Sequence, residues 1–267
     1  MSSIQILPHR SENRGNADYG WLKTFHSYSW ARAIRGFDAE EHDHWGCLLV
    51  INEDRVQAHT GFGTHPHREF EIFSYVVSGE LEHRDSMGNT EILKRGDLQM
   101  TSAGTGIRHS ERAHGDKDVH FLQIWSLPTR GGLTPQYFTR HFSDEEKKDK
   151  WARIVAPVDA EGVIEKREAG GAAPVHSPLT LFATILSPSK SLDYKLERPK
   201  GYIHVVQTSG YHTGKATGGT VKVSGSGKSF ELREGDGAYL SGADGEVKLE
   251  NVGDRATEIL LFDLDEL

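Results

Sequence analysis

The sequence feature that most constrains the fold is a series of short β-type runs separated by glycine and polar turn residues. Between Trp45 and Trp125 the runs read CLLVI, EIFSYVVSGELEHR, TEILKRGDLQM and VHFLQIWSL. Turn signals at Ser86-Met87-Gly88-Asn89 and Arg95-Gly96-Asp97 interrupt them. Runs of β-branched and aromatic residues broken at this spacing are typical of a β-sandwich or small barrel. We therefore predict an all-β first half.

A second series of the same kind fills the last third of the chain, as LTLFATILS, YIHVVQTSG, GTVKVSG, KSFELREGDGAYLSG, EVKLENVG and TEILLFDL. The sequence LKRGD, from Leu93 to Asp97, is echoed by LREGD, from Leu232 to Asp236. The similar order of runs indicates an internal duplication. A chain of 267 residues is long enough for two modest domains that each bury a core.

The segment between the two series differs from both. In SDEEKKDKWAR, Ser143 can cap a helix and Glu146 can complete a capping box, which predicts a short helix. The following VIEKREAGGAAPVHSP has the composition of a linker or an exposed hairpin. We predict an N-terminal metal-binding domain over 1–137, a connecting helix and linker over 138–175, and a C-terminal domain without a metal motif over 176–267.

Charge and hydropathy exclude several classes of function. The net charge of −8 and pI near 6.0 disfavour direct binding to nucleic acid or to an anionic membrane. No apolar run approaches the roughly 20 residues that span a bilayer, and the polar N-terminus does not resemble a signal peptide. We expect a cytoplasmic protein, with a nuclear location left open. The single cysteine, Cys47, cannot form an internal disulfide and is expected to be a small buried side chain.

Two histidine motifs carry the strongest chemical signal. In THPHREFE, His65 and His67 stand two residues apart, so on a strand both project from one face. In RHSE, His109 and Glu111 repeat this spacing. Three imidazole nitrogens and one carboxylate oxygen, with coordination positions left open, suit a divalent first-row metal. We expect Fe, with Zn, Ni, Mn, Co or Cu as substitutes, whereas a structural zinc site would more often use cysteine.

The same motifs resemble the pirin family, whose members are bicupins. The matching stretches are DYGWLKTFHSYSW, GFGTHPHREFEIFSYVVSGELEHRDSMGN, GDLQMTSAGTGIRHSE, VHFLQIW and GGLTPQY, which together cover residues 18 to 137 densely. The resemblance implies two cupin-type barrels (double-stranded β-helix, or jelly-roll) in tandem, joined by the short helix. It also implies that His65, His67, His109 and Glu111 are the metal ligands.

One position departs from the general cupin pattern. Glu71 occupies the spacing of a ligand glutamate, but the resemblance gives that role to Glu111 and leaves Glu71 as a supporting residue or a base. If the strand is unbroken, Glu69 and Glu71 share the parity of the two histidines, so at least one lines the cavity. We interpret the remaining histidines of this half as structural or surface residues: His59, His83, His114 and His120.

The second half contains no comparable cluster. His204 and His212 are isolated, so we expect a metal-free barrel that covers the first barrel and stabilises the pair. Its match to the family rests on length and pattern, with few diagnostic residues.

For function, the resemblance implies a quercetin 2,3-dioxygenase-like oxidoreductase that cleaves the flavonol ring and releases carbon monoxide. The metal would bind the 3-hydroxyl oxygen, and Glu71 or Glu111 would help to remove its proton. Its partners would be a small aromatic substrate and dioxygen, and we expect a monomer.

One alternative is an iron-binding, redox-switched protein-interaction module, similar to pirins that act as transcriptional co-regulators. Another is a cupin with a structural metal. A roomy apolar mouth beside the metal would favour the enzyme.

Overall fold

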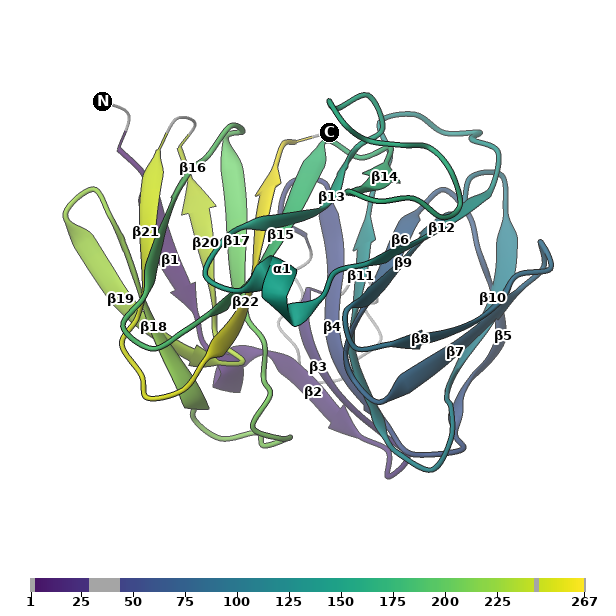
Figure 1. Cartoon of the computed structure of the whole chain (residues 1–267), viewed down its shortest axis with the longest axis horizontal. Coiled ribbons are helices and arrows are strands. Elements are labelled where there is room, and N and C mark those ends of the chain that lie inside the picture. Colours follow the sequence, from purple (N-terminus) through teal and green to yellow (C-terminus); the bar gives the residue numbers. More distant parts are fainter. Residues whose placement is uncertain (1–2, 29–43, 243–244, 267) are drawn as a thin grey trace. The chain divides into compact units, whose positions relative to one another are not determined.

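The structure is a computed structural model that describes residues 3–28, 44–242 and 245–266, and it is almost entirely β (Figure 1). The chain forms two compact units. The first barrel consists of residues 15–142 and 156–178, and the second barrel of residues 3–14, 143–155 and 179–266. The predicted all-β class with a short helix is confirmed. Among the described residues, no helix is long and apolar enough to cross a membrane.

The first barrel is built from a larger and a smaller antiparallel sheet. The larger has the order β12-β9-β6-β11-β4-β3-β2, and the smaller β5-β10-β7-β8. The strands of the larger sheet are β2 (Gly15–Asp18), β3 (Leu22–Tyr28), β4 (Leu48–Val56), β6 (Glu71–Ser78), β9 (Asp97–Ser102), β11 (Val119–Ser126) and β12 (Gln136–His141). Those of the smaller sheet are β5 (Gly61–His67), β7 (Glu80–Asp85), β8 (Thr90–Lys94) and β10 (Ile107–Ala113).

The second barrel repeats this plan. Its larger sheet runs β1-β20-β17-β22-β15-β13 and its smaller sheet β16-β21-β18-β19. The strands of the larger sheet are β1 (Gln5–His9), β13 (Ala152–Pro157), β15 (Leu179–Leu186), β17 (Lys200–Val205), β20 (Gly237–Ser241) and β22 (Thr257–Leu264). Those of the smaller sheet are β16 (Ser191–Lys195), β18 (Thr217–Gly225), β19 (Lys228–Glu234) and β21 (Glu246–Asn251). The first strand of the chain therefore belongs to the barrel formed mostly by its last third.

The glycine-aspartate turn that suggested a duplication has the same geometry in both barrels. Gly96 adopts a φ of 87° and Gly235 a φ of 94°, a backbone conformation that favours glycine. The carboxylate of Asp97 accepts a hydrogen bond from the Lys94 backbone N–H at 2.8 Å. Asp236 accepts the same bond from Arg233 at 3.0 Å. Each turn connects the smaller sheet of its barrel to the larger one.

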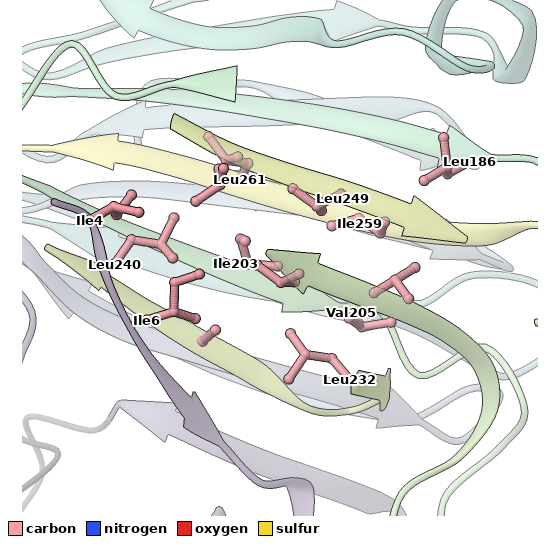
Figure 2. Close-up of a cluster of buried hydrophobic side chains, with 14 of the residues drawn as sticks. Ile4, Ile6, Leu186, Ile203, Val205, Leu232, Leu240, Leu249, Ile259 and Leu261 are labelled. Carbon is pink, nitrogen blue, oxygen red and sulfur yellow. The ribbon is translucent and has the colours of Figure 1, made fainter. Parts of the chain in front are cut away.

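The interiors of the two barrels differ in chemistry. Aliphatic side chains from both sheets fill the second barrel, as Figure 2 shows for Ile203, Leu249 and Leu261 among others. In the first barrel an apolar cluster fills only part of the interior: Leu22, Val56, Val76, Leu81, Leu93, Ala113, Val119 and Phe121. The rest of that interior contains buried histidine, glutamate and glutamine side chains.

The helix α1 (Asp144–Lys147) has the predicted cap. The Ser143 hydroxyl accepts from the Glu146 backbone N–H, and the Glu146 carboxylate accepts from the Ser143 N–H. A 3-10 turn, η1 (Ser11–Asn13), follows β1. Cys47 is buried, as expected.

The segment from residue 156 to residue 178 packs with the first barrel and includes β14 (Ala173–Val175). Hydrogen bonds from Arg140 hold the segment in place. Its buried guanidinium donates to the backbone carbonyls of Ile164, Lys166 and Arg167.

Candidate metal centre

Three of the predicted ligands come together at the edge of the smaller sheet. Strands β5 and β10 are antiparallel, and their register places His109 opposite His65 and Ile107 opposite His67. The imidazole rings of the three histidines lie with centroids 4.6 to 4.8 Å apart. β5 is the edge strand, which is where Pro66 was expected because proline cannot donate to a ladder.

Hydrogen bonds orient two of these rings. His65 Nδ1 lies 2.7 Å from the carbonyl oxygen of Gly63, so Nδ1 carries the proton and Nε2 presents a lone pair. That Nε2 lies 3.1 Å from His109 Nε2. His67 Nε2 is buried and has no hydrogen-bond partner. A nitrogen left in this state, beside two others, fits a bound cation.

Burial keeps the rings of His67 and His109 neutral. Loss of solvent, reinforced by repulsion from the neighbouring histidines, lowers the pKa of His67 to about 4. Burial likewise lowers the pKa of His109. Neutral imidazole is the form that binds a metal ion. His67 and His109 are buried, whereas His65 is partly exposed, so the cluster reaches the surface at His65.

Glu111 lies deeper and is held by three donors. Its Oε1 accepts from the Ser74 hydroxyl at 3.1 Å and from the Gln99 amide, and its Oε2 accepts from the Gln123 amide at 2.7 Å. Burial alone would raise the pKa of Glu111, but the nearby histidines and Ser74 outweigh it and leave the pKa below its ordinary value. This carboxylate groups with His109 and His83, rather than with His65 and His67.

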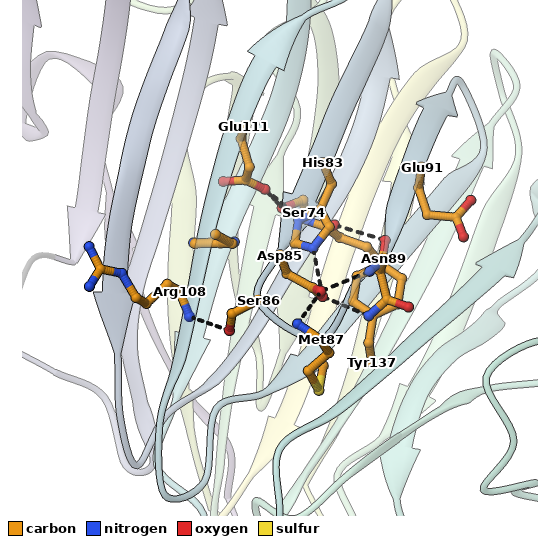
Figure 3. A network of polar contacts seen from close by, with 12 residues as sticks. Ser74, His83, Asp85, Ser86, Met87, Asn89, Glu91, Arg108, Glu111 and Tyr137 are labelled. Carbon is orange, nitrogen blue, oxygen red and sulfur yellow. Dashed lines mark hydrogen bonds and ion pairs between the residues drawn. The ribbon is translucent and has the colours of Figure 1, made fainter.

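His83 is the site residue that the sequence reasoning missed. It was interpreted as structural or surface, yet it is fully buried and stands opposite Glu111 in the β7–β10 register. Its ring stacks on Tyr137, and its Nε2 lies 3.3 Å from the Asp85 carboxylate (Figure 3). Asp85, two residues after His83, was the sequence signal that could have identified this histidine, since a carboxylate often orients a ligand histidine.

Glu71 and Glu69 do not continue the strand of the two histidines. β5 ends at His67, β6 begins at Glu71 in the other sheet, and Glu69 has a φ of 62°. The parity argument for these glutamates required an unbroken strand and is therefore wrong. Glu69 accepts from the Gly132 N–H at 3.0 Å. Glu71 is buried, which raises its pKa, and accepts from the Ser102 hydroxyl and the His176 N–H.

Three further histidines of the first barrel lie outside both groups. His59 is exposed and faces Asp116, His114 faces Glu82, and His120 is buried against Glu53. Both groups that the described residues offer for a metal ion lie in the first barrel.

Aromatic side chains stand next to the cluster. The Trp125 ring meets His67 edge to face at 4.8 Å, and Phe70 lies 5.3 Å from Trp125. Both side chains are partly exposed. An apolar wall therefore adjoins the histidines on the side of His67.

Two jelly-roll barrels in tandem, one of them with a buried histidine cluster, define a bicupin. Residues 9–126 match the family model described as Pirin. The quercetin 2,3-dioxygenase of Escherichia coli is 34% identical over 265 residues, which is 97% of this chain and 98% of that protein. The chain belongs to the pirin family.

Further relatives agree with this assignment. A Zymomonas mobilis protein provisionally named quercetin 2,3-dioxygenase is 40% identical over 201 residues, covering 75% of this chain and 80% of that one. The bacterial pirin YhhW of Escherichia coli, solved in complex with nickel(II), has a TM-score of 0.79 and 30% identity, covering 98% of this chain and all of that one.

Proposed function

We propose that the chain is a metal-dependent dioxygenase that acts on a flavonol such as quercetin. The observation that carries the proposal is the convergence of His65, His67 and His109, with one ring fixed by the Gly63 carbonyl and one nitrogen left without a partner. The relatives named quercetin 2,3-dioxygenase support the substrate class. Iron remains the metal that we propose, and the nickel complex of the similar pirin supports a divalent ion more generally.

A divalent ion held by His65, His67, His109 and Glu111 would polarise an oxygen atom of the substrate and, if redox-active, support reaction with dioxygen. The burial of His67 and His109 keeps both rings neutral and excludes water from the inner side of the site. The partly exposed His65 leaves the outer side open to a substrate.

Of the two carboxylates considered as bases, Glu111 is better placed to accept the proton of the substrate hydroxyl. It groups with His109, and its neighbours keep it ionised. We propose that Glu71 has a supporting role, because its carboxyl joins β6 to β9 through Ser102 and to the 156–178 segment through His176.

The side chains beside the site favour the enzyme over the redox-switched interaction module. Phe70 and Trp125 form an apolar wall beside His67, and a flavonol is a flat aromatic molecule that such a wall can bind.

The test is anaerobic reconstitution with Fe(II), followed by quercetin and oxygen. We expect loss of the flavonol absorbance with release of carbon monoxide in the native protein, and neither in His109→Ala. Stoichiometric iron binding without turnover would contradict the proposed activity and favour the interaction module or a different substrate.

A further inference from the structure

We propose that the first barrel carries an anion-binding basin, away from the candidate metal centre, that takes a small oxyanion such as a phosphate or carboxylate group. The basin has a volume of about 500 Å³. His114, which lines it, directly follows the end of β10, whereas His109 lies near the start of that strand, roughly 17 Å away along the chain. The inference depends neither on the metal nor on the substrate proposed above.

The charges around the basin differ from those of the whole chain. The chain has a net charge of −8, yet the cations that line the basin outnumber the carboxylates. One of these carboxylates, Asp116, is almost fully exposed and lies 3.0 Å from His59 Nε2. A concave surface with a local excess of positive charge attracts anions. The ionisable side chains of the lining are Lys94, Arg95, Lys117, Glu80, Asp116 and His114.

A short connection explains why this place is open in the first barrel. Strands β6 and β7 are joined by Gly79 alone, and Gly79 lines the basin. In the second barrel β17 and β18 occupy the same places in the sheet orders, but they are joined by residues 206–216. The first barrel therefore lacks a loop that the second barrel has at this position.

The second barrel shows how the same place is filled when such a loop is present. Arg95 in LKRGD corresponds to Glu234 in LREGD. Glu234 is buried, and its carboxylate accepts from the Thr208 hydroxyl at 3.0 Å. It also accepts from the backbone N–H groups of Ser209 at 2.7 Å and Gly219 at 3.0 Å. The loop and the start of β18 thus enclose a carboxylate that belongs to the chain itself.

The first barrel has a cation at the position of this carboxylate. Arg95 Nη1 donates to the Val77 carbonyl oxygen at 2.7 Å, which holds the guanidinium beside the basin. Lys94 and Lys117 add two exposed ammonium groups. Carboxylate and phosphate oxygens are the preferred partners of such cations. We therefore expect an external oxyanion in the first barrel, where no carboxylate replaces Glu234.

The test is isothermal titration calorimetry of inorganic phosphate into the native protein, at an ionic strength held constant with KCl. We expect saturable binding. Lys94→Gln combined with Lys117→Gln removes two exposed cations and should weaken this binding about 10-fold or more. The matched control combines Lys148→Gln with Lys150→Gln, two exposed lysines of the second barrel, and should leave phosphate affinity unchanged.

Two further variants separate the basin from the metal. Phosphate can also bind a metal ion, so His109→Ala should retain the binding that belongs to the basin. Arg95→Glu introduces the residue of the second barrel, and the reversed charge should abolish phosphate binding, with circular dichroism to check the fold. Binding that disappears in His109→Ala but persists in the lysine double variant would overturn the proposal. Native affinity in Arg95→Glu would overturn it as well.

The same titration with malonate, a dicarboxylate, identifies the preferred group. Tighter binding of phosphate would assign the basin to a phosphate group, and tighter binding of malonate would assign it to a carboxylate. A native protein that binds neither anion would refute the basin, whatever its metal content or its activity on a flavonol.

Discussion

The two barrels share a strand order but fill their interiors with opposite chemistry. The first contains buried histidines, a glutamate and two glutamines around the candidate metal centre, whereas the second has a cluster of aliphatic side chains. Because the same glycine-aspartate turn occurs in both, the strand registers on either side of it relate the two interiors residue by residue.

This comparison replaces six polar residues of the first interior with apolar ones. The equivalences follow from counting along each strand from the turn and then crossing to the hydrogen-bonded partner on the neighbouring strand. The equivalent residues are Val247 for His109, Leu249 for Glu111, Val223 for His83, Ile203 for Ser74, Ala238 for Gln99 and Leu261 for Gln123. All six replacements belong to the core cluster of the second barrel.

The second barrel therefore forms this fold with apolar residues at these six positions. Buried polar groups lower stability unless they are hydrogen-bonded, and several nitrogens of the first barrel have no partner. We infer that the polar interior of the first barrel exists for a ligand rather than for the fold, and four predictions test this difference.

The largest effect should follow the loss of a proposed metal ligand. His109→Ala removes one of the three imidazole nitrogens of the candidate metal centre, so we expect stoichiometric Fe(II) or Co(II) binding to disappear. His204→Ala, in the second barrel, should bind as the native protein does. Elemental analysis after anaerobic dialysis measures both, and full metal content in His109→Ala would refute the assignment of the site.

The second-largest effect should be a loss of stability when a carboxylate is introduced into the apolar interior of the second barrel. Leu249→Glu puts at the equivalent of Glu111 a charge that lacks the Ser74, Gln99 and Gln123 donors, so the second barrel should lose roughly 3 to 5 kcal/mol of stability. Denaturant unfolding followed by circular dichroism measures it. Glu250→Gln, which removes only a surface pair with Lys222, should leave the unfolding midpoint close to that of the native protein. If Leu249→Glu and Glu250→Gln change stability equally, the interior of the second barrel tolerates a buried charge and the prediction is wrong.

A smaller effect, on metal affinity, is expected from removing one of the hydrogen-bond donors to Glu111. Gln123→Leu introduces the residue found at the equivalent position of the second barrel and removes the 2.7 Å bond to Oε2. We expect metal affinity to fall about 10- to 100-fold with the fold retained. Gln136→Leu, which loses only an exposed bond to Glu165, is the control. Unchanged affinity in Gln123→Leu would show that the donors do not position this carboxylate.

The smallest effect is a pH dependence of the first barrel. Burial raises the pKa of Asp54 from 3.8 to about 7. Between these values the folded state binds more protons than the unfolded state, so stability should fall as pH rises, by at most about 1.4 kcal/mol per pH unit. Asp54→Asn cannot titrate and should lose this slope. Denaturation midpoints at pH 5.5 and 6.5 measure it, and an identical slope in the variant would contradict it.

Much of the fold was predictable because it depends on local rules. Alternating β-type runs, the Ser143 capping box and the paired glycine-aspartate turns each have a signature within a few residues. His65 and His67 could likewise be paired from their spacing on one strand. The confirmed fold class and family rest on such short-range patterns.

The tertiary structure decided what depends on strand pairing. The position of Gln5–His9 in the second barrel and the placement of His83 opposite Glu111 both follow from register between segments far apart in the chain. The break after His67, which separates Glu71 from the histidines, also became visible only in space. A sequence specifies which side chains can share a strand face, but which strands become neighbours is set by burial of the whole core. By itself the sequence therefore determined the strand pattern, the duplication and the histidine pairs, whereas His83 lies beside His109 and Glu111 only because the folded sheet brings their strands together.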